Sequence, residues 1–169
     1  KQLPLAKVRL YDGPQPPYPA TRSQHTMCKL EHASVTVRDL DGVVKFLTTA
    51  FPSFRVRGDG QFEHGSWTQK WLHVGTDTDY IALYQAGPNS TGRPAAHSFT
   101  PSVNHLGFVV EDTDRIRQRL SAAGYKEGFI AEPHPYRKRL YFEDNEGFTW
   151  EFVEYLTDDP AKRNLYDGS

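Results

Sequence analysis

The sequence has a single cysteine, Cys28, among 169 residues. One cysteine cannot form a disulfide bond within the chain, which excludes a small secreted scaffold held together by disulfides. A lone cysteine is typical of proteins in a reducing compartment, so we expect a cytoplasmic location.

The sequence also lacks a long apolar run and an excess of charge. No hydrophobic stretch approaches the roughly 20 residues that a membrane-spanning helix needs, so no membrane partner is expected. Lys and Arg number 20 against 21 Asp and Glu, a formal net charge of −1. Such a chain has no general attraction for nucleic acid, and no nucleic-acid partner is expected. The hydrophobic fraction of 37% is enough for one compact domain or for two small modules that share a core.

Residues 1–27 lack the periodicity of the rest of the chain. They are rich in proline and polar residues, as in "YDGPQPPYPATRSQHT", and are predicted to form an extended or disordered arm. Regular hydrophobic patterns cover residues 28–156, which we interpret as the folded domain. The polar residues 157–169 are expected to form a loosely packed tail.

The folded part of the chain contains an internal repeat. The stretch "LEHASVTVRDLD" at 30–41 aligns without a gap with "VNHLGFVVEDTD" at 103–114, so that His32 matches His105. Residues 70–85 align in the same way with 139–154, which places Ala82 opposite Glu151. Two copies of one unit, each too small to bury its own sheet, are expected to pair around a shared core. We place module one at residues 28–88 and module two at residues 102–156.

Each module has the same predicted order of elements: a strand, a helix and three more strands. Alternating apolar residues predict the first strands at 32–37 and 104–110, and apolar stripes predict helices at 39–51 and 112–124. The other strands are predicted at 53–58, 70–75, 79–85, 126–131, 138–144 and 148–155. The predicted fold class is α+β, with two paired β-α-β-β-β modules forming a cupped mixed β-sheet and a helix on the outer face of each module.

Three potential metal ligands lie on the helix-free faces of the predicted strands. His32 and His105 occupy equivalent positions in the first strands, and Glu151 in the last strand points away from Trp150. If the helix-free faces curve toward each other, these three side chains converge in one concavity. Two imidazoles and one carboxylate suit one divalent ion of Fe, Mn, Zn, Ni or Co and leave positions open for a substrate.

The repeat, the order of elements and these ligands together resemble the vicinal oxygen chelate superfamily, which includes glyoxalase I, extradiol dioxygenases and the fosfomycin and bleomycin resistance proteins. The resemblance covers residues 28–156. It implies a divalent metal ion held by His32, His105 and Glu151, from the first and last strands of the modules. Ala82 stands where glyoxalase I has a fourth ligand. A vacant fourth position is similar to extradiol dioxygenases and fosfomycin-modifying enzymes.

Two further residues are candidate catalytic groups by the same resemblance. Tyr141 precedes Glu151 by ten residues, like the tyrosine in the penultimate strand of those enzymes whose hydroxyl reaches the bound substrate. His134 lies in the loop before that strand, where an extradiol-type enzyme could use it to hydrogen-bond oxygen or substrate. Extradiol enzymes carry an acid–base histidine in the segment before the second module. His97 lies in that segment here, but it is closer to His105 than is usual in the family.

The resemblance therefore implies a metal-dependent enzyme that binds a small substrate through two adjacent oxygens, with extradiol dioxygenase-like activity as the first expectation. The alternatives are a glyoxalase-type isomerase or lyase, an antibiotic-modifying transferase, and a metal-free binding protein of the bleomycin-resistance type. Members of the superfamily form the cup either within one chain or between two chains. A homodimer is thus one of the two expected assemblies.

Overall fold

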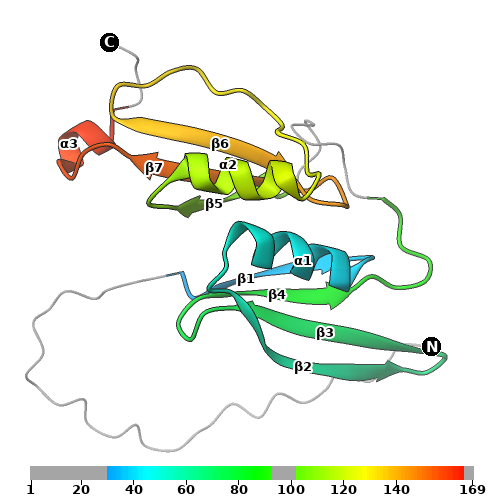
Figure 1. Cartoon of the computed structure of the whole chain (residues 1–169). Coiled ribbons are helices and arrows are strands. Elements are labelled where there is room, and N and C mark those ends of the chain that lie inside the picture. The colour runs from blue at the N-terminus through cyan, green and yellow to red at the C-terminus, as the bar shows by residue number, and fades with distance from the viewer. Residues whose placement is uncertain (1–29, 93–101, 166–169) are drawn as a thin grey trace, which may run out of the picture.

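The computed structural model describes residues 30–92 and 102–165, which form two β-sheets with two helices, α1 and α2, between them (Figure 1). The elements in chain order are β1 (His32–Val37), α1 (Leu40–Ala50), β2 (Arg55–His64), β3 (Trp67–Gly75), β4 (Tyr80–Gln85), β5 (His105–Val109), α2 (Thr113–Ala122), β6 (Arg137–Glu143), β7 (Thr149–Tyr155) and α3 (Pro160–Arg163). The first sheet has the order β1-β4-β3-β2, and the second has the order β5-β7-β6. The predicted arm, Cys28 and His97 lie outside the described residues. No helix in the described ranges is long and apolar enough to cross a membrane.

The two modules repeat the same strand pairing. In each, the first strand runs parallel to the last, β1 with β4 and β5 with β7, and the penultimate strand is antiparallel to the last. Ser34 pairs with Ala82, and Gly107 pairs with Glu151, so the aligned repeat positions are structurally equivalent. The prediction of an α+β fold of paired modules is confirmed.

Equivalent aspartates begin both main helices. Asp39 accepts a hydrogen bond from the Gly42 N–H at 2.9 Å, and Asp112 accepts one from the Arg115 N–H at 3.0 Å. A side-chain oxygen at this position satisfies an N–H group that has no partner within the helix. The repeat of these aspartates in the sequence therefore has a local structural cause.

The strand predicted at 126–131 is wrong. In this segment Glu127 alone forms an isolated bridge, with Phe142, and the Gly128 N–H donates to the Tyr141 carbonyl at 2.8 Å. A strand at a sheet face buries alternate side chains, yet the consecutive residues Phe129 and Ile130 are 54% and 81% exposed. In the described structure the second sheet therefore has three strands, and an irregular segment runs beside β6.

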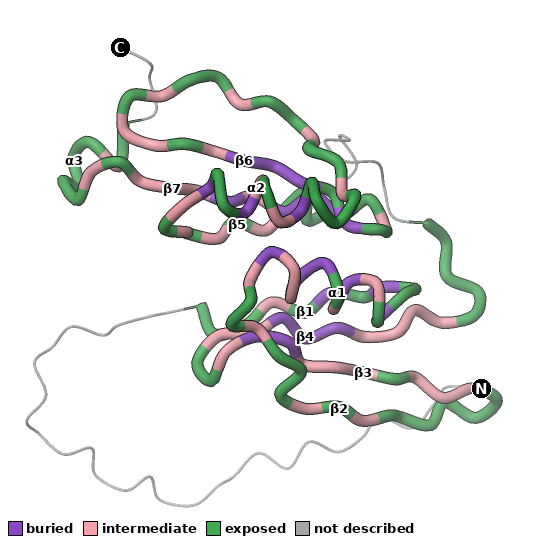
Figure 2. The backbone as a smooth tube through the Cα atoms, viewed as in Figure 1, coloured by how far each residue is buried: buried purple, intermediate pink, exposed green. Residues whose placement is uncertain are grey.

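Module one differs from its prediction in the length of two strands, since the strand predicted at 70–75 begins at Trp67. The strand predicted at 53–58 extends to His64, because Gly65 turns the chain with φ of 66° into a hairpin with β3. β2 carries no buried residue, whereas α1, β1 and β4 carry many (Figure 2). The hairpin of β2 and β3 thus extends away from the core at its turn, while Val74 at the other end of β3 is part of the core.

The core is shared between the modules through α1. Phe46 of α1 is fully buried and stacks on Trp150 of the second sheet with ring centroids 6.0 Å apart. Phe51 follows the helix and lies 4.9 Å from the ring of Phe108. The apolar side chains of α1 therefore pack against both modules, as expected for units that cannot bury their sheets alone.

Polar groups of module two hold both ends of α1. At its N-terminus, Glu146 accepts hydrogen bonds from the N–H groups of Arg38 and Asp39, each at 2.5 Å. At its C-terminus, the Arg119 guanidinium donates to the carbonyls of Thr49 and Ala50 at 3.1 and 2.6 Å. The modules of one chain therefore meet on the helix side of their sheets.

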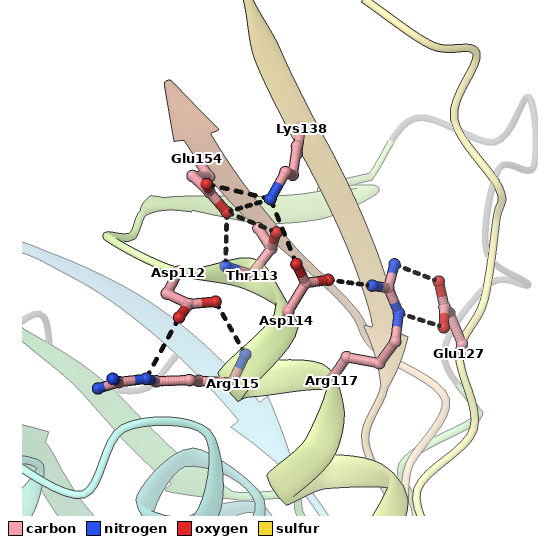
Figure 3. A network of polar contacts seen from close by, with 8 residues as sticks. All are labelled: Asp112, Thr113, Asp114, Arg115, Arg117, Glu127, Lys138 and Glu154. Carbon is pink, nitrogen blue, oxygen red and sulfur yellow. Dashed lines mark hydrogen bonds and ion pairs between the residues drawn. The ribbon is translucent and has the colours of Figure 1, made fainter. Parts of the chain in front are cut away.

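A network of charged groups joins the N-terminus of α2 to the second sheet (Figure 3). The Glu154 carboxylate accepts from the Thr113 N–H at 2.9 Å and from the Thr113 hydroxyl at 2.8 Å. Lys138 pairs with Glu154 at 3.2 Å and with Asp114 at 3.3 Å. Arg117 pairs with Glu127 at 3.0 Å, which anchors the irregular segment to α2.

Candidate functional site

Three predicted site residues lie together on the helix-free face of the second sheet. His105 Nε2 lies 3.2 Å from Glu151 Oε2. The Tyr141 hydroxyl donates to the other carboxylate oxygen, Oε1, at 2.5 Å. The rings of His105 and Tyr141 are almost perpendicular, with centroids 5.9 Å apart. Each residue comes from a different strand, so the sheet itself fixes the arrangement.

Strand register and one glycine create this arrangement. In the ladder, Tyr141 is opposite Glu151 on one side and Gly107 is opposite it on the other. A Cβ atom on Gly107 would lie 3.3 Å from Glu151 Oε2, closer than most such contacts in proteins. The absence of a side chain at Gly107 therefore leaves room for the carboxylate beside His105.

Burial and hydrogen bonding set the protonation of Tyr141. Burial of the side chain, and then its hydrogen bond to Glu151, raise the pKa of Tyr141 to about 12. The phenol therefore keeps its proton at neutral pH and acts as a hydrogen-bond donor. By donating to Oε1 it orients the carboxylate and leaves Oε2 facing His105.

His105 and Glu151 fit a divalent metal ion as two of its ligands. Two ligand atoms that are each about 2.1 Å from one ion are typically about 3 Å from each other, which is close to the spacing of Nε2 and Oε2. Ligating carboxylates are usually held by hydrogen bonds from a neighbouring group, and Tyr141 has this position. The donor types, their spacing and this hydrogen bond are compatible with two of the three ligands expected from the sequence.

His32, the third predicted ligand, lies apart from this pair in the first sheet. Its Nδ1 is 2.6 Å from Glu31 Oε2, its ring stacks on Tyr80 at 4.9 Å, and its side chain is 42% exposed. Its Nε2 makes no hydrogen bond to a described residue. Among residues 30–92 and 102–165, no three His, Cys, Asp or Glu side chains gather as a metal site. The chain therefore brings two of its three predicted ligands together.

Aromatic rings surround His32 on the helix-free face of the first sheet. They form a chain of neighbouring rings with centroids 4.6 to 6.4 Å apart: His32, Tyr80, His73, Trp71, Phe62 and Tyr84. Arg57 lies over the Tyr80 ring at 4.6 Å. Burial, and then the charge of Arg57, lower the pKa of His73, which favours its neutral form.

His134 is a structural residue in this conformation. Its Nδ1 accepts the Tyr136 N–H at 3.1 Å, and its Nε2 lies 3.1 Å from the Leu165 carbonyl oxygen. These two contacts define the neutral tautomer with the proton on Nε2. His134 contacts none of His105, Tyr141 and Glu151, so the structure does not bring it to the site.

Sequence reasoning missed Glu31, Gly107 and the position of His73. Glu31 directly precedes His32. Because neighbouring residues of a strand point to opposite faces, no contact between their side chains was expected. A glycine inside a predicted strand was the available signal for Gly107. His73 lies opposite Ala82, as Tyr141 lies opposite Glu151. His73 is therefore the structural equivalent of Tyr141. The gapless sequence alignment paired Tyr141 with Leu72, the residue before His73.

A family model places the chain among known proteins. The model of the Glyoxalase/Bleomycin resistance protein/Dioxygenase superfamily matches residues 29–152, and the chain belongs to this superfamily. No curated protein sequence matches the chain significantly. The resemblance drawn from the repeat and the candidate ligands is thereby confirmed at the level of the superfamily.

Solved structures share the fold at low sequence identity. A glyoxylase/bleomycin resistance protein/dioxygenase domain from Frankia sp. EAN1pec is 22% identical with a TM-score of 0.64, covering 83% of this chain and all of that one. A glyoxalase family protein from Bacillus cereus is 18% identical with a TM-score of 0.63, covering 81% of this chain and all of that one. A point mutant of the fosfomycin resistance protein FosX from Listeria monocytogenes, solved with Mn(II) and 1S,2S-dihydroxypropylphosphonic acid, is 16% identical with a TM-score of 0.57. That match covers 81% of this chain and 98% of FosX.

A cavity of about 370 Å³ lies elsewhere, along the free edge of β1. Its walls include residues 33–38, Val103 and Leu106. None of His32, His105 and Glu151 lines it, so it is not the site that the ligand chemistry indicates.

Proposed function

We propose that the protein is a divalent-metal-dependent enzyme of the vicinal oxygen chelate type, which binds a small substrate through two adjacent oxygens. The observation that carries the proposal is the pair of His105 Nε2 and Glu151 Oε2, 3.2 Å apart, with Tyr141 hydrogen-bonded to the same carboxylate. The FosX structure with Mn(II) and a small phosphonic acid supports a divalent ion and a small ligand for a protein of this fold.

A second copy of the chain supplies His32 to this site. The modules of one chain meet on their helix sides, and apolar side chains on the helix-free faces are exposed, Phe62 by 48% and Val109 by 69%. In a symmetric dimer, the first sheet of one copy covers the second sheet of the other, which buries this apolar surface. His32 of one copy then joins His105 and Glu151 of the other, and the dimer has two equivalent sites.

Within such a site the protein's own groups bind and orient the substrate. Tyr141, protonated at neutral pH because its pKa is raised to about 12, keeps its proton on the bond to Glu151, and its hydroxyl oxygen accepts a hydrogen bond from a substrate hydroxyl. Glu31 holds Nδ1 of His32 and leaves Nε2 available as a ligand atom. A divalent ion held by His32, His105 and Glu151 would supply positive charge next to the two substrate oxygens, where negative charge develops.

The metal indicates the reaction class. If the protein contains iron, we expect extradiol-type ring opening of a catechol-like substrate, which is the first expectation from the sequence. Manganese, zinc, nickel or cobalt corresponds to isomerase, lyase or addition chemistry. His134 is engaged at both ring nitrogens by backbone groups, so in this conformation it supplies no acid–base group to either reaction.

The experiment that tests the proposal combines metal analysis with mixing of subunits. Protein purified without chelator or a nickel column is expected to contain about one equivalent of divalent metal per chain. His32→Ala and Glu151→Ala variants are each expected to lose it. When the two variants are co-refolded in equal amounts, about half the dimers are mixed and each has one intact site of two, so about a quarter of the wild-type metal content returns.

Several outcomes of this experiment are informative. A His64→Ala variant, whose ring contacts Gln69 on the outer hairpin, serves as the control and keeps its metal. If mixing restores no metal while the single variants lack it, the cup forms within one chain. If the wild-type protein neither contains nor takes up metal, the proposal of a metalloenzyme is wrong.

The aromatic rings around His32 favour one second candidate, a metal-free binding protein for a planar ligand. Trp71 lies in the chain of rings and reports a ligand through its fluorescence, whereas Trp150 is fully buried in the core. Quenching by planar aromatic ligands in a wild-type protein that takes up no metal, and its loss in Trp71→Phe, would support this candidate.

A further inference from the structure

Arg139 differs from two neighbouring cations of module two, Lys138 and Arg117, in its lack of a carboxylate partner. On the helix side of β6, Lys138 pairs with Glu154 and Asp114, and nearby Arg117 pairs with Glu127 (Figure 3). In the two described ranges, no carboxylate lies within ion-pair distance of Arg139. The Nη2 atom of Arg139 donates a hydrogen bond to the Glu132 carbonyl oxygen at 3.3 Å.

The guanidinium of Arg139 also has a buried donor with no partner. Its Nε atom is buried and makes no hydrogen bond to a described residue. A buried donor left without an acceptor costs free energy, and an arginine in this state is suited to a ligand that accepts a hydrogen bond. The planar fork of donors in guanidinium matches the paired oxygens of a carboxylate or phosphate group.

The place of Arg139 connects it to the candidate site. Arg139 and Tyr141 are two residues apart on β6, so their side chains leave the same face of the sheet. Burial and Glu151 raise the pKa of Tyr141. Arg139 is close enough to Tyr141 to lower that pKa, although by less.

We infer that Arg139 forms an oxyanion subsite, which binds a carboxylate or a phosphate-like group of the substrate next to Tyr141. Same-face neighbours on a strand are separated by about 7 Å, so this group lies about that far from the substrate oxygen that Tyr141 contacts. The substrate class is then a small molecule with an anionic group at one end and two adjacent oxygens at the other. The assignment of a substrate class rests on the proposed function. Binding of an oxyanion to Arg139 can be measured whether or not the protein is a metalloenzyme.

The test measures binding of simple oxyanions to the metal-free protein by equilibrium dialysis. The probes are inorganic phosphate and methylphosphonate, which are tetrahedral, and acetate, which is planar, each in a buffer of constant ionic strength. Wild-type protein is expected to bind the preferred probe with a Kd on the order of 1 mM. Arg139→Gln is expected to weaken binding about tenfold or more, because bonds to a charged donor are lost. The shape of the tighter probe distinguishes a carboxylate substrate from a phosphate-like one.

Two variants control for surface charge and for folding. Arg115→Gln removes an exposed arginine that pairs with Asp112, and it is expected to bind the probes as the wild type does. Arg139→Lys keeps the charge without the fork, and it is expected to bind with intermediate affinity and to replace Arg139→Gln if that variant does not fold. Equal binding by wild type, Arg139→Gln and Arg115→Gln, or no binding by the wild type, would overturn the inference.

Metal content separates this inference from the proposed function. Arg139→Gln is expected to keep the metal of the wild-type protein, because Arg139 is not a ligand. If the wild-type protein contains no metal but loses oxyanion binding in Arg139→Gln, the subsite stands and the metalloenzyme proposal fails. If metal is present and oxyanions do not bind, the subsite fails alone.

Discussion

The Tyr141 hydroxyl donates a hydrogen bond of 2.5 Å to Glu151, and the opposite oxygen of that carboxylate faces His105. One phenol thus sets the orientation of a carboxylate that is mostly buried, with its side chain 14% exposed. Groups that orient metal ligands in this way contribute to metal affinity although they do not bind the ion.

Tyr141→Phe is therefore expected to weaken metal binding by about 10- to 100-fold without loss of the fold. The measurement is a metal titration against a competing chelator. Tyr155→Phe is the matched control, since Tyr155 lies on the same strand face as Glu151 and its ring packs on Arg163 at 4.0 Å. Unchanged metal affinity in Tyr141→Phe would show that the hydroxyl does not position the ligand.

A glycine opposite Glu151 offers a second test of the same site. The new methyl group in Gly107→Ala would lie 3.3 Å from Glu151 Oε2 and push the carboxylate away from His105. Metal affinity is expected to fall about tenfold, as for other groups that position a ligand. Unfolding free energy is expected to change by less than about 1 kcal/mol, because alanine is tolerated in strands.

Gly58→Ala is the control for the glycine substitution. Gly58 also lies in a strand, and a Cβ there meets Trp71 at an ordinary distance of 3.9 Å. Both variants are compared by chelator competition and by urea unfolding. A loss of metal affinity in Gly58→Ala equal to that in Gly107→Ala would contradict the local explanation.

The equivalence of the two modules could be predicted from the sequence, because local patterns determine it. Alternation within a strand identifies the helix-free face, and strand pairing then sets Glu151 beside Gly107 and Tyr141. Those contacts lie within one sheet. The contact of Tyr141 with Glu151 was therefore accessible to sequence reasoning.

The relation between the modules could not be predicted in the same way. It depends on long-range packing such as the stacking of Phe46 on Trp150 and the bonds from Arg38 to Glu146, which leave no periodic signal. The alternation of residues in β1 shows that His32 lies on the helix-free face of the first sheet. It does not show which other sheet packs against that face. The wrong strand at 126–131 has a similar cause, since exposure of Phe129 is decided by the surrounding fold.

Arg57 offers a test of the electrostatics of the aromatic face. Burial first, and then the charges of Arg57 and His32, lower the pKa of His73, while Glu31 acts in the opposite direction. Arg57→Gln is expected to raise the pKa of His73, as followed by NMR titration of the imidazole. Arg55→Gln, which loses the ion pair with Asp77, is the control with no expected effect.

The sign of the linked stability effect is also defined. A lowered pKa in the folded state means that the unfolded chain binds the proton more readily. The contribution of His73 to stability is therefore complete above its unfolded pKa of about 6.5 and is lost as pH falls through the folded pKa. Arg57→Gln is expected to reduce this acid-side loss, and a pKa of His73 that is unchanged or falls would contradict the assignment.

Glu154 gives the clearest prediction for stability, because it joins α2 to β6. Although burial acts to raise the pKa of Glu154, the two hydrogen bonds from Thr113 and the contact with Lys138 outweigh it, and the pKa is lowered. Its contribution to stability is thus present above the unfolded pKa of about 4.5 and is lost as pH falls through the folded pKa. Glu154→Gln is expected to destabilise the protein by about 1–2 kcal/mol at pH 7, because hydrogen bonds to a charged acceptor are weakened.

Urea unfolding at pH 7 and at pH 3 measures this contribution. The difference between wild type and Glu154→Gln is expected to shrink at pH 3, where protonation removes the charge from the wild-type carboxyl as well. Glu132→Gln is the control, since Glu132 is exposed and its carboxylate forms no ion pair with a described residue. A difference that stays constant between the two pH values would mean that shape, and not charge, accounts for the role of Glu154 at the start of α2.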